Sequence, residues 1–210
     1  MKRAGLALAV LGALALPTGA GAATYRFGSS LTAPANKIEA HPVDAVFWAG
    51  ALPNGATFRA PAKGRISKIK VKGTVVKRNG VAPDNRIHFQ TLRPISGGKV
   101  KVILTTGKFT VPIGGDPNRI SEYAPVNLCA HKGDYIALAD VGGYKPGSYP
   151  NGAPFRVFSS GITGAVTGFF SGNGHRNGDT FKGTAHTGEE LLMRMVEVTG
   201  TAAGNYCNTH

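Results

Sequence analysis

Basic residues at alternate positions are the clearest candidates for chemistry in this chain. Lys68, Lys70 and Lys72 are separated by Ile69 and Val71. Alternate side chains of a β-strand point to opposite faces, so the three lysines are expected on one solvent-facing side and the two β-branched residues on the other. The pattern predicts a basic strand face.

The surrounding sequence strengthens this prediction. No acidic residue occurs from position 45 to position 83, and Lys99 and Lys101 alternate in the same way further along the chain. If both lysine strands belong to one sheet, with His88 and Gln90 between them, the positive surface would be continuous. Such a surface attracts polyanions, namely teichoic acids, uronic-acid glycans or nucleic acid. The competing interpretation is a solvated sheet face whose lysines maintain solubility and protect an edge.

Acids and histidines offer weaker candidates. Asp140 ends an apolar strand and is the acid best placed for catalysis, although aspartates there commonly cap turns. Glu189 and Glu190 are adjacent, so we expect them on opposite sides of a strand and not as a carboxylate pair. Four histidines lack metal-binding spacing, and we predict no metal and no cofactor. They are His41, His131, His175 and His186.

Two loops complete the survey of candidate sites. Tyr144, Pro146, Tyr149 and Pro150 cluster in one loop, where aromatic rings either stack on sugars or pack against the fold. Residues 171–179 lack the alternating acids of a calcium loop. The sequence contains no nucleophile elbow and no phosphate-binding loop. We therefore predict no catalytic residues.

Six segments have the residue pattern of strands. The residue patterns predict strands at 68–72, 86–92, 99–104, 135–139, 154–158 and 191–198, several of which alternate apolar and polar residues. The segment 135–139 is uniformly apolar, which indicates a central strand covered on both faces. Turn-forming Asn-Gly, Gly-Gly and Gly-Asp pairs separate the strands. The pattern predicts an all-β fold, a single-domain antiparallel β-sandwich of the jelly-roll type.

The N-terminus has the features of a cleaved export signal. Lys2 and Arg3 precede an apolar stretch that Pro17 closes, and residues 20–22 fit the small-x-small rule of signal peptidase. We predict a signal peptide at 1–22, a lead-in at 23–45, the sandwich at 46–200 and a tail at 201–210. The 210 residues include 24 basic and 11 acidic residues, so the net charge is +13. This composition excludes wholesale disorder, a collagen-like chain and a cysteine-rich scaffold.

Cys129 and Cys207 are the two cysteines of the chain. An even number of cysteines in an exported protein favours a disulfide, which would attach the C-terminal tail to the body of the fold. Two separate thiols are the alternative.

Several motifs resemble a group of secreted actinobacterial β-sandwich proteins of uncharacterised function. The matching motifs are His41-Pro42-Val43-Asp44, Phe58-Arg59-Ala60-Pro61, His88-Phe89-Gln90-Thr91, Ala124-Pro125-Val126-Asn127-Leu128-Cys129, Asp140-x-Gly142-Gly143 and Glu190-Leu191-Leu192-Met193. The resemblance implies export and an all-β fold. It transfers no functional residues.

These observations together favour a secreted, non-catalytic module. Its partner would be an anionic polysaccharide or cell-envelope polymer, bound through Lys68, Lys70, Lys72, Lys99 and Lys101. Export argues against a role with intracellular nucleic acid. The sequence has no second apolar run, so we predict no integral membrane contact. A glycan-active hydrolase or lyase on a jelly-roll scaffold and a structural surface component are the alternatives, and the oligomeric state is open.

Overall fold

Antiparallel pairing joins the strands into three sheets in the computed structural model, which describes residues 21–141, 148–172 and 176–209. The five-stranded sheet has the order β1 (Thr24–Gly28), β16 (Met193–Val198), β4 (Gly64–Lys72) and β8 (Ile120–Tyr123), with β9 (Cys129–Ala130) also pairing with β4. The seven-stranded sheet has the order β13 (Thr180–Lys182), β7 (Lys99–Thr105), β6 (Ile87–Ile95), β10 (Tyr135–Asp140), β3 (Ala45–Ala51), β12 (Val166–Ser171) and β14 (Thr184–Thr187).

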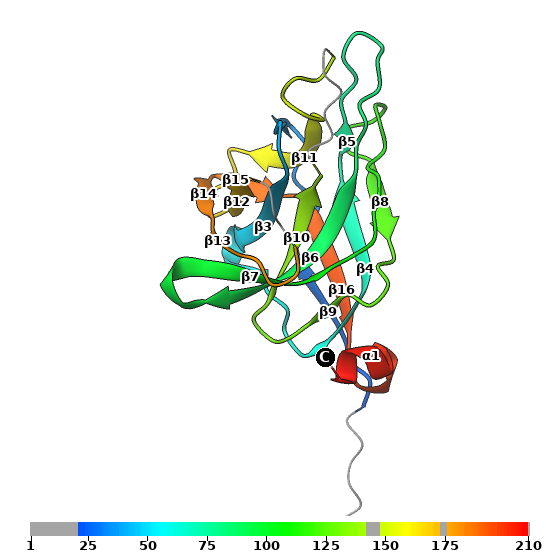
Figure 1. Cartoon of the computed structure of the whole chain (residues 1–210), viewed down its shortest axis with the longest axis vertical. Coiled ribbons are helices and arrows are strands. Elements are labelled where there is room, and N and C mark those ends of the chain that lie inside the picture. Colours follow the sequence, from blue (N-terminus) through cyan, green and yellow to red (C-terminus); the bar gives the residue numbers. More distant parts are fainter. Residues whose placement is uncertain (1–20, 142–147, 173–175, 210) are drawn as a thin grey trace, which may run out of the picture.

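The third sheet is small. It has the order β15 (Glu189–Leu191), β11 (Phe155–Ser160) and β2 (Lys37–Glu39), with β5 (Thr74–Val75) also pairing with β11. Three short 3-10 turns are η1 (Pro53–Gly55), η2 (Ser96–Gly98) and η3 (Gly200–Ala203), and the chain ends in helix α1 (Gly204–Thr209). Figure 1 shows the sheets curling around one another, with α1 at one end of the molecule. The predicted all-β, antiparallel sandwich in a single domain is confirmed.

The main core lies where the sheets face one another. Ile69 and Met195 of the five-stranded sheet, Phe47 and Leu138 of the seven-stranded sheet, and Phe158 of the small sheet belong to one buried cluster. Because apolar burial is the dominant favourable contribution to folding, these contacts hold the three sheets together.

Strand β10 is buried along its whole length, as the sequence predicts. Ile136 and Leu138 face the main core, whereas Tyr135, Ala137 and Ala139 belong to a second cluster on the opposite side of the sheet. Both faces are covered, which explains why this strand does not alternate between apolar and polar residues.

The sandwich extends beyond the boundaries expected from the sequence. Within the lead-in at 23–45, β1 pairs with β16 and β2 pairs with β11. The candidate signal segment at 1–22 lies almost wholly outside the described residues. The strand predicted at 191–198 corresponds to the last residue of β15 and the whole of β16.

The predicted disulfide is present. Cys129 in β9 is bonded to Cys207 in α1, across a sequence separation of 78 residues. Arg65 of β4 donates a hydrogen bond to the carbonyl oxygen of Ala202, at 3.3 Å, next to this link. The predicted tail is therefore attached to the edge of the five-stranded sheet.

Removal of the disulfide is expected to destabilise the fold substantially. In the double variant Cys129→Ser/Cys207→Ser, the unfolded chain regains loop entropy, and the free energy of unfolding should fall by about 4 kcal/mol. Urea denaturation of the oxidised protein and of this variant measures the difference. A change smaller than about 1 kcal/mol would contradict a stabilising role for this link.

A β-bulge alters the register next to a buried acid. Val196 pairs with Lys68 but Glu197 pairs with Ile66, so Ser67 is an extra residue in β4. Glu197 is fully buried and accepts a hydrogen bond from the backbone N–H of Ala62 at 3.3 Å. Burial raises the pKa of Glu197 to about 7, although this hydrogen bond opposes the shift.

This buried acid makes stability depend on pH. Between its ordinary pKa of 4.5 and the folded value of about 7, the native state binds more protons than the unfolded state, so stability falls as pH rises. We expect wild type to lose about 2–3 kcal/mol relative to Glu197→Gln between pH 4.5 and pH 7.5. Urea denaturation at several pH values measures this, and parallel stability profiles for the two proteins would contradict it.

Candidate functional site

The structure separates the five lysines that the sequence groups together. Lys68 and Lys70 lie on the outer face of the five-stranded sheet, with side chains 46% and 29% exposed. Lys99 and Lys101 belong to β7, in the seven-stranded sheet. The condition for one continuous lysine surface, a shared sheet, is therefore not met.

Lys72 is not on a solvent face at all. Its residue is only 7% exposed, and its Nζ donates hydrogen bonds to the carbonyl oxygens of Leu31 at 3.1 Å and Ala33 at 2.7 Å. Strand parity places Lys72 on the same side as Lys68 and Lys70, but the segment after β1 runs over this end of the sheet. Alternation along a strand predicts the sheet face to which a side chain points, but it does not predict whether another segment covers that face.

Two arginines that the sequence analysis did not single out lie beside Lys68 and Lys70. Across the sheet, Arg26 of β1 pairs with Val196, which pairs with Lys68, while Arg194 of β16 pairs with Lys70. Arg26, Lys68, Lys70, Arg194 and Val196 line a concavity of about 280 Å³. We call the four cations the basic face. Arg26 precedes the apolar Phe27, and Arg194 lies between Met193 and Met195. This alternation of apolar and basic residues was the sequence signal that could have placed both arginines on a solvent-facing side.

In the described part of the chain, one acid contacts the basic face. Glu122 of β8 forms ion pairs with Lys68 at 2.7 Å and Lys70 at 2.5 Å. Hydrogen bonds from these two lysines lower the pKa of Glu122 to about 2, so it stays ionised. Among the residues that the structure describes, no carboxylate pairs with Arg26 or Arg194. Like charges directly across a strand pair, as in Arg194 and Lys70, cost stability unless an anion compensates them.

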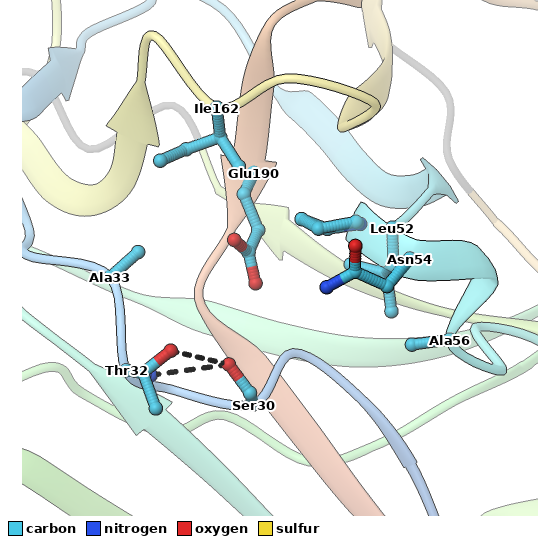
Figure 2. Close-up of a pocket in the computed structure, with 9 residues that line it drawn as sticks. Ser30, Thr32, Ala33, Leu52, Asn54, Ala56, Ile162 and Glu190 are labelled. Atoms are coloured by element: carbon cyan, nitrogen blue, oxygen red, sulfur yellow. Dashed lines mark hydrogen bonds between the residues drawn. The ribbon is translucent and has the colours of Figure 1, made fainter.

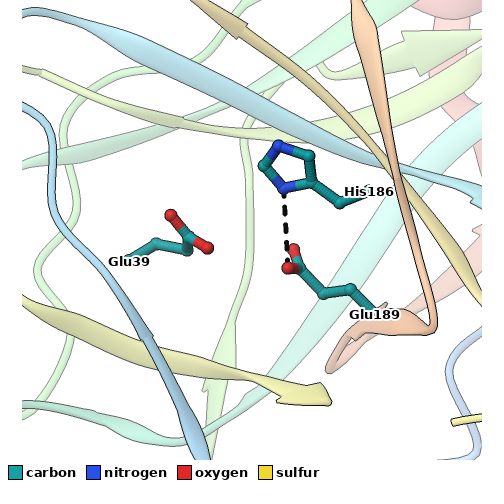
Figure 3. A group of neighbouring side chains, drawn as sticks. All are labelled: Glu39, His186 and Glu189. Atoms are coloured by element: carbon teal, nitrogen blue, oxygen red, sulfur yellow. Dashed lines mark ion pairs between the residues drawn. The ribbon is translucent and has the colours of Figure 1, made fainter. Parts of the chain in front are cut away.

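Glu189 and Glu190 lie on opposite sides of β15, as predicted. Glu190 lines a pocket of about 490 Å³, where its carboxylate points into the space between Ser30, Thr32 and Asn54 (Figure 2). Glu189 instead faces β2 and β14 (Figure 3).

The Glu189 side holds a cluster that only the fold assembles. Lys37 contacts both Glu39, at 2.7 Å, and Glu189, while His41 lies 3.2 Å from Glu39 and His186 lies 3.5 Å from Glu189. One ligand atom from each of Glu39, His186 and Glu189 lies within 4.8 Å of the others, which is a potential metal-ligand set. Sequence spacing missed this set because its members come from three strands.

The lysine already supplies the cation that this cluster needs. Burial alone would raise the pKa of Glu39, but hydrogen bonds from His41 and Lys37 outweigh it and lower the pKa to about 2. Burial likewise opposes the charge on Lys37, yet the hydrogen bond to Glu189 raises its pKa. Because the ammonium group contacts both carboxylates, Lys37 and Glu39 of β2 are linked to Glu189 of β15.

The same geometry bears on the hydrolase alternative, which needs two acids facing one open groove. Glu39 and Glu189 are close together, but their side chains are only 15% and 3% exposed and Lys37 bridges them. Asp140 is buried, and within the described ranges its two carboxylate oxygens have no hydrogen-bond partner. Burial, with the charge of Asp44, raises its pKa well above the ordinary value. These acids are not arranged to contact a polymer.

The remaining predicted candidates do not add a site. Tyr149 is fully buried and its hydroxyl donates to the carbonyl oxygen of Val81, so its ring is packed within the fold and is not available to a sugar. Tyr144, Pro146 and His175 lie outside the described residues, as do positions 173 and 174 of the loop at 171–179.

Comparisons with family models, curated proteins and solved structures find no match. The resemblance to secreted actinobacterial proteins therefore stays a prediction. In the described part of the chain, no helix has the length and apolar character required to cross a membrane.

Lys72 is expected to be a stabilising residue. Lys72→Met leaves the carbonyl oxygens of Leu31 and Ala33 without their donor, which should lower the free energy of unfolding by about 1–3 kcal/mol. The matched control is Lys68→Met, for which we expect a change within about 0.5 kcal/mol because Lys68 is exposed. Equal urea midpoints for the two variants would contradict the structural role of Lys72.

Proposed function

We propose that this protein is an exported, non-catalytic module that binds an anionic glycan or cell-envelope polymer on the basic face. The observation that carries the proposal is the convergence of four cations from three adjacent strands on one concavity. Arg26 and Arg194 supply guanidinium groups, whose planar donors match carboxylate and phosphate oxygens.

The position of Glu122 also supports the proposal that the basic face binds anions. Its carboxylate lies between Lys68 and Lys70 as a carboxylate or phosphate group of a polymer would. A bound polyanion would compete with Glu122 for the lysines but would meet no competing carboxylate at Arg26 or Arg194 among the described residues. The described residues that line the concavity include no aromatic ring, which favours a charged polymer over stacked nucleic-acid bases.

The electrostatic character of this binding makes it sensitive to salt. Attraction between exposed charges is screened over about 10 Å at 0.1 M ionic strength. Export to an environment of envelope polymers and glycans would provide such partners, and the disulfide between Cys129 and Cys207 suits an oxidising compartment.

Charge reversal on the basic face tests the proposal. We expect Arg26→Glu/Arg194→Glu to weaken retention on polygalacturonate or polyglycerol phosphate about tenfold, since two exposed ion pairs contribute about 1.4 kcal/mol together. Retention of wild type should fall steeply as the salt concentration is raised from about 50 to about 300 mM. The measurement is affinity chromatography combined with titration calorimetry.

Two further variants separate a local site from net charge. Lys99→Glu/Lys101→Glu makes the same change in charge on a different sheet and should retain binding, whereas Glu122→Gln should strengthen it. If the two double variants lose affinity equally, the lysines and arginines act only through net charge, and the basic face is a solvated surface and not a binding site.

A further inference from the structure

The two glutamates of β15 differ in how their charges are compensated. Glu189 is 2% exposed and contacts Lys37, so its charge is balanced within the protein. Glu190 is 3% exposed, but no hydrogen bond or ion pair from any described residue reaches its carboxylate. Its carboxylate is therefore an unpaired acceptor on a largely buried residue, and it lines a pocket that a cationic ligand could enter.

The carboxylate of Glu190 faces a formed cavity. The pocket has a volume of about 490 Å³, within the range of about 300–1,000 Å³ that is usual for small-molecule sites. Figure 2 shows the carboxylate pointing toward the hydroxyl groups of Ser30 and Thr32 and toward the Asn54 amide. Leu52 and Ile162 supply apolar surface to the same pocket.

The polar side of the pocket is held in place by the fold. The hydroxyl groups of Ser30 and Thr32 lie 2.7 Å apart, and Leu31 between them has a positive φ of 61°. Leu31 is buried against Leu192, while the Lys72 ammonium group holds the carbonyl oxygens of Leu31 and Ala33. The wall is therefore ordered before any ligand binds, and Lys72 is committed to backbone oxygens.

We infer that the Glu190 pocket binds a protonated primary amine. The ammonium group would lie against the Glu190 carboxylate, within reach of the Ser30 and Thr32 hydroxyl groups. These three groups offer oxygen acceptors that match the three N–H donors of an ammonium group. The carbon frame of the ligand would pack against Leu52 and Ile162.

A divalent metal ion fits this site less well. Calcium takes six to eight oxygen ligands and usually several carboxylates, whereas this pocket provides one carboxylate beside an apolar wall. An organic cation uses both the charge and the apolar surface. The amine could come from an amino sugar or from a small alkanolamine, since both present the same ammonium group.

The experiment measures binding of glucosamine and ethanolamine to the whole protein by titration calorimetry and NMR chemical-shift changes. We expect both amines, or one of them, to bind wild type, and Glu190→Gln to weaken that binding at least tenfold. Ala56→Trp places a large side chain at the exposed rim of the pocket and should block entry without changing the buried acid. The N-acetyl derivatives lack the charge and should not bind.

Each outcome decides the inference. Binding of glucosamine alone or ethanolamine alone supports it and identifies the source of the amine. Equal affinity in wild type and Glu190→Gln, equal binding of the N-acetyl derivatives, or Glu190-dependent binding of CaCl₂ without amine binding overturns it. Glu122→Gln alters only the basic face and should leave amine affinity unchanged, so this result is independent of polyanion binding.

Discussion

The stretch from Glu189 to Val198 belongs to two sheets, and the arrangement of the candidate sites depends on where it changes sheet. At Leu192 the backbone N–H donates to the carbonyl oxygen of Val157, and the carbonyl oxygen accepts from the N–H of Lys72. Before this residue the chain pairs with β11, and after it the chain pairs with β1 and β4. Side chains alternate on each strand, so this one segment places Glu189 in the cluster with Lys37 and Glu190 in the pocket. It also places Arg194 on the basic face.

The buried charges of this protein are managed by different physical means. Lys72 is solvated by backbone carbonyl groups, and Asp134 accepts two hydrogen bonds of 2.9 Å from Arg93. Burial raises the pKa of Glu197 and that of Asp140, which favours their neutral forms. Glu190 differs from all of these because it faces a cavity. This acidic pocket lies next to Ser30, whose carbonyl oxygen lies 3.5 Å from Arg194.

Local patterns predicted the fold and the disulfide well, but only part of the candidate site. Alternation identified β4, β6 and β7, and the uniformly apolar residues of β10 indicated a strand covered on both faces. The same alternation placed Lys72 in solvent, where the segment after β1 in fact buries it. Lys99 and Lys101 were joined to Lys68 on the assumption of one sheet, and strand order, which depends on long-range pairing, overturned that assumption.

The sequence by itself determined the strand content, the excess of positive charge and the pair of cysteines, because these follow from composition and from periodicity over a few residues. Only the tertiary structure decided which cations share a surface. Arg26 and Lys68 are distant in the chain and become neighbours because both strands flank β16. The acidic pocket was likewise beyond sequence reasoning, since its walls come from four separate segments. Residues far apart in sequence meet only when the whole core forms, and no local pattern encodes that meeting.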